Sequence, residues 1–167
     1  MNSNFEKLHT FSFDVSKLFD EWEQATIAET ATKSMYVRTA INYSSNQSQH
    51  ISTYQPDLIV PSFKNSYTQF VITDVSNWLA DKGLKCTKIK YAALKPGHTI
   101  PEHTDINYTN RYHLTVQVND DCSMTINRVS YPLIENCTLY RMLASVPHSA
   151  SNLGSTVRLL ITFDVDS

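Results

Sequence analysis

The chain has 167 residues and a formal net charge of -2 at pH 7, with 14 Lys and Arg against 16 Asp and Glu. This length is enough for one domain with a hydrophobic core and is short for two, so we expect residues 1–167 to form a single domain. Because the basic residues are scattered, we expect no nucleic acid or membrane partner. No apolar run approaches the roughly 18 residues of a membrane span, and the amino end does not resemble a signal peptide, so we expect a cytoplasmic protein.

Two amphipathic helices are predicted in the N-terminal half. Residues 13–25 place apolar side chains at helical spacing, and Asp14 or Ser16 can cap the amino end. Residues 66–83 repeat this spacing, and Gly83 can end the helix. Each helix therefore has one face to bury.

The segment between these helices has a different composition. Residues 42–63 are rich in Ser, Asn and Gln and contain two prolines. We predict a long irregular connection or a partly ordered flap, which could close over a site as active-site lids do.

From residue 84 onwards the sequence changes to short runs rich in Val, Ile, Thr and Tyr, separated by Pro, Gly, Asn and Asp. The runs are KCTKIKYAAL, RYHLTVQV, SMTINRVSYPL, TLYRMLA and TVRLLITFDV. Short strands at this spacing predict a sandwich or a jelly-roll barrel in residues 84–167, with the helices and loops of residues 1–83 packed on it. The three cysteines have no CxxC spacing, so we expect them to be reduced residues of the core or strands.

The segment LKPGHTIPEHTDINYTNRYHL, residues 94–114, holds three of the six histidines. In an extended strand, side chains two positions apart share a face, so His103 and Asp105 are expected to point to the same place. His148 lies just before the last predicted strand and can supply a third ligand. Two histidines and one carboxylate form the facial arrangement of non-heme Fe(II) oxygenases.

Arg158 opens a predicted strand that is otherwise apolar, STVRLLITFD. A guanidinium that faces a core requires a planar anionic partner, because burying it unpaired would cost several kcal/mol. A carboxylate bound by the guanidinium fork is the natural partner.

These motifs together resemble the Fe(II)- and 2-oxoglutarate-dependent dioxygenases, specifically the aspartyl/asparaginyl β-hydroxylase-like branch. The matching text is LKPGHTIPEHTD, then RYHL, then PHSASNLGSTVRLLITFD, within about residues 90–166. The expected fold is mainly β with N-terminal helices and a double-stranded β-helix (jelly-roll, cupin-like) core. The resemblance implies that Fe(II) is bound by His103, Asp105 and His148.

The resemblance also implies the position of the co-substrate. Arg158 would anchor the distal carboxylate of 2-oxoglutarate, and Arg111 and His113, two apart on one strand face, would lie beside it. The implied reaction uses O2 to hydroxylate an unactivated C–H bond, with succinate and CO2 as co-products. Asp105 argues against halogenation, because halogenases that resemble this family lack the carboxylate.

Animal β-hydroxylases of this branch replace the metal-binding carboxylate with glycine and carry a helical-repeat region, and neither feature occurs here. A small substrate, such as a free amino acid, is therefore slightly favoured over a protein side chain. The alternative is a cupin-type metal- or ligand-binding jelly-roll protein without 2-oxoglutarate turnover. The sequence leaves the oligomeric state open.

Candidate substrate residues follow from their predicted positions. Residues 107–109 come directly after the proposed ligands and are expected on a loop near the iron. Arg128 or Arg141, on neighbouring strands, could hold an acidic group, and our hypothesis is that Arg141 faces the cavity and binds a substrate carboxylate.

Overall fold

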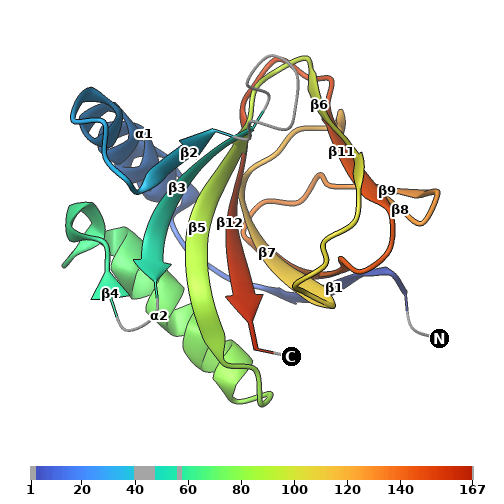
Figure 1. Cartoon of the computed structure of the whole chain (residues 1–167), viewed down its shortest axis with the longest axis horizontal. Coiled ribbons are helices and arrows are strands. Elements are labelled where there is room, and N and C mark those ends of the chain that lie inside the picture. The colour runs from blue at the N-terminus through green and yellow to red at the C-terminus, as the bar shows by residue number, and fades with distance from the viewer. Residues whose placement is uncertain (1–2, 40–47, 56–57, 167) are drawn as a thin grey trace.

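The computed structural model describes residues 3–39, 48–55 and 58–166 (Figure 1). Within these residues the helices are α1 (Val15–Ala31), α2 (Tyr67–Ala80) and a short 3-10 helix (Pro61–Phe63). The strands of the larger sheet are β1 (Phe5–Thr10), β2 (Val37–Thr39), β3 (Ser48–Gln55), β4 (Leu58–Ile59), β5 (Cys86–Leu94), β7 (Asn110–Gln117), β10 (Thr138–Leu143) and β12 (Arg158–Val165). The strands of the smaller sheet are β6 (His98–His103), β8 (Cys122–Ile126), β9 (Val129–Pro132) and β11 (His148–Asn152).

The two sheets form the predicted jelly roll. The larger sheet has the order β1-β10-β7-β12-β5-β3-β2, with β4 beside β3, and the smaller sheet has the order β6-β11-β8-β9. Figure 1 shows both helices on one face of the larger sheet and the smaller sheet across from its other face. The mainly β fold with N-terminal helices and a double-stranded β-helix core is confirmed.

Along each central strand of the larger sheet, successive side chains point alternately toward the helices and toward the smaller sheet. On β5, Ile89 and Tyr91 belong to the core shared with the helices, whereas Lys90 and Ala92 line a cavity between the sheets. Strand β12 is buried along its whole length. Its helix-facing residues are all apolar, whereas its cavity-facing residues include the polar Arg158 and Thr162.

Both predicted helices are present. The Asp14 side chain accepts a hydrogen bond from the Lys17 backbone N–H and caps α1, which continues to Ala31, beyond the predicted end. Ser66 caps α2 in the same way. After α2 the chain turns at Gly83, which has a φ of 80° that glycine adopts without strain.

The prediction of an irregular flap over residues 42–63 is wrong for its described part. Residues 48–55 form β3, which pairs with β5 along most of its length, and residues 58–59 form β4. Residues 42–47 and 56–57 lie outside the described residues. The N-terminal part also contributes β1, which pairs with β10, so residues 1–83 are not made only of helices and loops.

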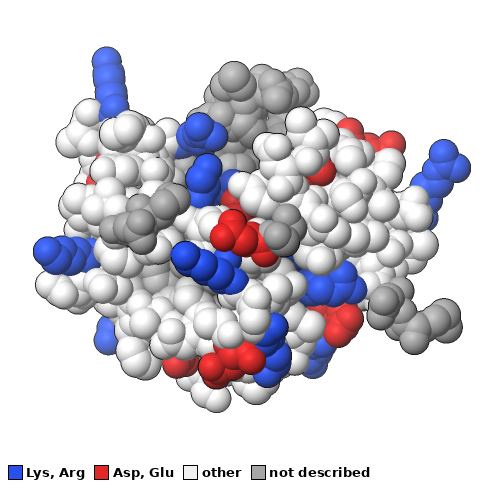
Figure 2. All heavy atoms as spheres, turned by 60° about the horizontal axis from the view of Figure 1, so that its bottom comes forward, with Lys and Arg blue, Asp and Glu red and all other residues white. Residues whose placement is uncertain are grey.

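Charged side chains of both signs are interspersed on the face shown in Figure 2. This mixture agrees with the small net charge of -2. Within the described residues, neither helix is long and apolar enough to cross a membrane.

Candidate metal centre

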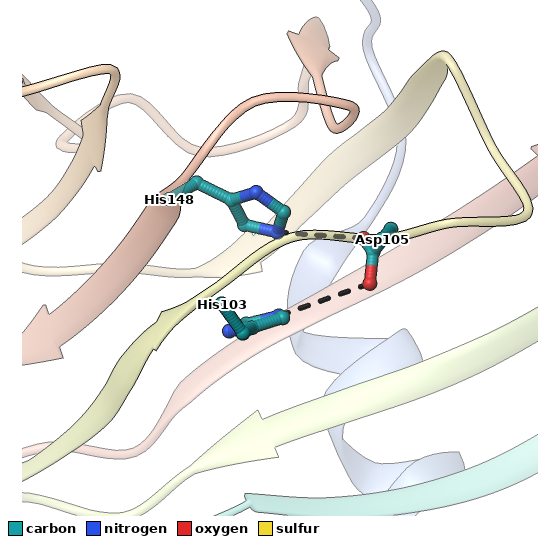
Figure 3. A group of neighbouring side chains, drawn as sticks. All are labelled: His103, Asp105 and His148. Carbon is teal, nitrogen blue, oxygen red and sulfur yellow. Dashed lines mark ion pairs between the residues drawn. The ribbon is translucent and has the colours of Figure 1, made fainter.

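His103, Asp105 and His148 come together where two strands of the smaller sheet meet (Figure 3). His103 ends β6, His148 begins β11, and the two residues are direct partners in the antiparallel register. Asp105 lies just beyond β6, where its backbone N–H donates to the Ala144 carbonyl at 3.0 Å. Each side chain offers one ligand atom, and these atoms all lie within 4.8 Å of one another.

The two imidazoles are oriented by backbone carbonyls. His103 Nδ1 lies 2.8 Å from the Pro101 oxygen, and His148 Nδ1 lies 2.8 Å from the Val146 oxygen. A carbonyl can only accept, so each Nδ1 must carry the proton. This directs both Nε2 atoms toward Asp105, at 3.8 Å for His103 and 3.3 Å for His148. Metal-binding histidines typically donate the N–H of their other ring nitrogen to a group such as a backbone carbonyl.

The charges in this cluster favour an ionised carboxylate. Burial alone would raise the pKa of Asp105, but the hydrogen bond with His148 and the charge of Arg111 lower it overall. Burial alone would lower the pKa of His148, but its hydrogen bonds with Asp105 and the Val146 carbonyl raise it overall. The carboxylate thus favours a positive charge beside it, which a bound metal would also supply.

Arg111 connects Asp105 to the larger sheet. Its Nη1 lies 3.3 Å from Asp105 Oδ2, and its Nε lies 3.1 Å from Oδ1 of Asp164, a buried residue of β12. The Arg111 guanidinium also stands over the Tyr108 ring, 4.9 Å from the centroid. Arg111 lines the cavity, and its described polar contacts are to two carboxylates.

A cavity of about 90 Å³ lies between the sheets, next to these ligands. Its lining includes both histidines of the cluster, His103 and His148. The other polar side chains in its lining are Ser48, His50, Lys90, Arg111, His113, Ser149, Arg158 and Thr162.

Arg158 lies in this cavity and is 3% exposed. Its Nη1 lies 3.6 Å from the Met124 sulfur, while its Nε has no hydrogen-bond partner among the described residues. Burial lowers the pKa of Arg158 to about 10, so the side chain is still a cation at neutral pH. A buried cation with an unsatisfied N–H is suited to a carboxylate ligand.

His113, on β7, is also buried in the cavity wall. Neither ring nitrogen has a hydrogen-bond partner within the described part of the chain. Burial, then the charges of Arg111 and Arg158, lower the pKa of His113 to about 3, so the imidazole is neutral. It can therefore donate one hydrogen bond and accept another.

The hypothesis that Arg141 faces the cavity is wrong. Arg141 donates to Asn110 Oδ1 at 2.8 Å and forms an ion pair with Glu6 at 3.5 Å. Side chains alternate along β10, and Met142 takes the inward position that lines the cavity. Arg128 is exposed in the turn between β8 and β9, where its φ is 68°, so it does not line the cavity either.

Residues 107–109 lie, as predicted, on the loop after Asp105. Sequence reasoning assigned no role to Lys90 or Asp164, which both lie at the site. The alternation of side chains along a strand could have indicated them. Asp164 lies on the same face of β12 as Arg158, and Lys90 lies on the same face of β5 as Leu94.

The model of the aspartyl/asparaginyl beta-hydroxylase family matches residues 66–167. None of the curated proteins matches the sequence.

Three solved structures have the same fold over nearly the whole chain. A Pseudomonas putida prolyl-4-hydroxylase has 14% identity and a TM-score of 0.64, with 98% of this chain and 93% of that chain covered. AviO1 from Streptomyces viridochromogenes Tue57 has 9% identity and a TM-score of 0.65, with coverages of 98% and 89%. SnoK, a non-heme alpha ketoglutarate dependent carbocyclase from nogalamycin biosynthesis, has 10% identity and a TM-score of 0.71, with coverages of 97% and 79%.

Proposed function

Because the chain belongs to the aspartyl/asparaginyl β-hydroxylase family, we propose that it is an Fe(II)- and 2-oxoglutarate-dependent oxygenase. The reaction would convert an unactivated C–H bond of a small molecule or a protein side chain into C–OH. O2 would be consumed, and 2-oxoglutarate would become succinate and CO2. The observation that carries this proposal is the joint presence, in one cavity, of the three-residue cluster and a buried arginine without an acidic partner among the described residues.

His103, Asp105 and His148 would hold the iron. Two imidazole nitrogens and one carboxylate oxygen match the donor set of non-heme Fe(II) oxygenases, and three protein ligands leave positions for the co-substrate and O2. When bound, iron and 2-oxoglutarate together supply the oxidation. SnoK shares this fold and is itself alpha ketoglutarate dependent, which is consistent with the proposal.

The remaining cavity residues would position the co-substrate and keep the site dry. The Arg158 fork would bind the distal carboxylate of 2-oxoglutarate, which would satisfy its unpaired N–H. His113 would offer a neutral hydrogen-bonding group nearby. Apolar side chains of the lining, among them Ala92, Met142 and Leu160, would limit water around the reacting groups.

The test separates metal binding from co-substrate binding. Protein loaded anaerobically with Fe(II) is titrated with 2-oxoglutarate while the visible charge-transfer band is recorded. We expect His103→Ala to lose iron. Arg158→Gln should keep iron and bind 2-oxoglutarate at least about tenfold more weakly, since a charge-assisted bond is lost. The matched control is Arg128→Gln, which removes an exposed arginine outside the cavity and should behave as wild type.

Succinate release after admission of air then measures turnover. Iron binding by the wild type without a 2-oxoglutarate band would contradict the proposed function. That result would favour the cupin-type metal-binding protein instead.

A further inference from the structure

Lys90 is a cation on the cavity face of the larger sheet. It lies in β5, between β3 and β12, and its register partners are the uncharged residues Ser52 and Thr162. Ile89 and Tyr91 on either side of it pack toward the helices, so the Lys90 side chain points into the cavity. A lysine at this position is costly unless an anion compensates its charge, because the charge is partly desolvated.

Lys90 forms no ion pair with an acidic side chain in the described part of the chain. Its pKa is lowered to about 8, first by burial and then by the charge of Arg111. Asp164 and Asp105 act in the opposite direction, and Arg38 adds a further small repulsion. The amine is therefore mostly protonated at neutral pH, in surroundings that do not fully neutralise it.

The other charges of the proposed complex have partners. Arg111 is paired with Asp164, and Arg158 would be paired with the distal carboxylate of 2-oxoglutarate. Asp105 and the second carboxylate of 2-oxoglutarate would offset the two positive charges of Fe(II). Lys90 is the cavity-lining cation left without an anion in this set of described residues.

Lys90 lies at a distance from Arg158 along the cavity wall. Its register partner Thr162 is four residues from Arg158 along β12, which corresponds to roughly 13 Å of strand. Asp164, two residues further, contacts Arg111, which contacts the ligand Asp105. Lys90 thus lies on the cavity wall between the levels of Arg158 and Asp164, and the proposed iron ligands His103 and His148 line the same cavity.

We propose that Lys90 binds a carboxylate of the substrate, so that the substrate is a small organic acid or an amino acid. This inference rests on the proposed function and makes its substrate class specific. A carboxylate is favoured over a phosphate because a single ammonium matches one negative charge, whereas a phosphate carries up to two. Lys90 would be a specificity-determining residue that orients the acid while a C–H bond elsewhere in the substrate reacts.

The experiment uses paired compounds that differ only in this charge. Anaerobic protein loaded with Fe(II) and 2-oxoglutarate is titrated by calorimetry with amino acids and with their carboxamides, and succinate release is measured with the same compounds in air. O-phosphoethanolamine, which has a phosphate and an amine but no carboxylate, is included to test a phosphate. The variants are Lys90→Gln and Lys90→Arg, with Lys95→Gln as the control because Lys95 is an exposed turn residue after the same strand.

We expect the wild type and Lys95→Gln to favour an acid over its amide. Lys90→Gln should reduce kcat/KM for the acid by about tenfold or more, and Lys90→Arg should restore part of this activity. The charge-transfer band should show the same affinity for 2-oxoglutarate in all four proteins.

Three results would overturn the inference while leaving the proposed function intact. The first is an equal response of wild type and Lys90→Gln to every compound. The second is a preference for the amide or for O-phosphoethanolamine. The third is weaker 2-oxoglutarate binding by Lys90→Gln, which would assign Lys90 to the co-substrate. Absence of the charge-transfer band in the wild type would instead reject the proposed function, and this inference with it.

Discussion

Asp164 is the residue whose role is clearest from its contacts and least visible in the sequence. Its carboxylate is buried, holds the Arg111 Nε at 3.1 Å and so fixes the guanidinium that contacts Asp105. Asp105 stands on a loop rather than inside a strand, so this contact would help to hold its carboxylate in place as a proposed iron ligand. Residues that orient metal ligands often affect the metal affinity almost as strongly as the ligands themselves.

We therefore expect Asp164→Asn to weaken Fe(II) binding by about tenfold, because Arg111 loses its charged anchor and the Asp105 loop is held less well. Anaerobic titration with Fe(II) measures the dissociation constant, and circular dichroism verifies the fold. Asp166→Asn makes the same substitution at an exposed position two residues further and should bind as wild type. An unchanged Kd in a folded Asp164→Asn protein would show that Arg111 does not act through Asp164.

Single residues differ in how far the sequence could predict them. His103, Asp105 and His148 were identifiable because their spacing is a motif, and the structure brings their ligand atoms together. The contacts of Arg111 were not predictable, because its partner Asp164 comes into reach only through the register of β7 and β12. Arg141 was misplaced for a related reason, since one step along β10 moves a side chain to the other face.

At the level of whole elements, strand β3 escaped prediction because some of its polar residues line the cavity. Strand β3 reads SQHISTYQ, which is too polar for a typical strand. Its inward positions Ser48 and His50 line the cavity, while Ile51 belongs to the core beneath the helices. Where a strand lines this cavity, polar residues take the positions that would otherwise be apolar. Composition alone therefore does not indicate a strand there.

The two helices are joined by a capping interaction that is equally invisible in sequence. Glu21 of α1 accepts hydrogen bonds from the backbone N–H groups of Tyr67 and Thr68, at 3.0 and 2.7 Å, and from the Thr68 hydroxyl at 2.7 Å. These N–H groups belong to the first turn of α2, where no intrahelical acceptor exists. A carboxylate there is also favoured by the helix dipole.

Replacing Glu21 with Ala should lower the free energy of unfolding by about 2 kcal/mol, because backbone donors at the start of α2 lose a charged acceptor. Urea denaturation measures this difference. Glu23→Ala, two residues away on the exposed side of α1, should change stability by less than about 0.5 kcal/mol. Equal effects of the two substitutions would mean that Glu21 contributes no more than a surface residue.

For the molecule as a whole, one sheet serves two purposes. Its outer face packs with the helices in a core that includes Leu18, Val75, Tyr91 and Phe163. Its inner face carries polar groups that would be unfavourable in an ordinary core, such as Arg158 and His113. The apolar burial beneath the helices must therefore offset the unfavourable free energy of burying these cavity residues.

This division predicts how stability depends on pH. His113 has a pKa of about 3 in the folded protein because of its burial, whereas an unfolded histidine titrates near about 6.5. Below that pH the unfolded chain takes up a proton that the folded chain excludes, so the free energy of unfolding falls as the pH decreases from about 6.5 toward 3. The contribution is fully retained above this window.

In metal-free protein we expect the wild type to lose roughly 1.4 kcal/mol more than His113→Gln for each pH unit between about 6 and 4, as measured by urea denaturation. His9→Gln removes an exposed histidine and should follow the wild-type slope. Parallel curves for wild type and His113→Gln would show that His113 takes up its proton equally in both states, and therefore that its imidazole is not held neutral in the cavity. A steeper wild-type curve would assign part of the acid sensitivity to His113, beside His50, whose pKa is also lowered to about 3, mainly by burial.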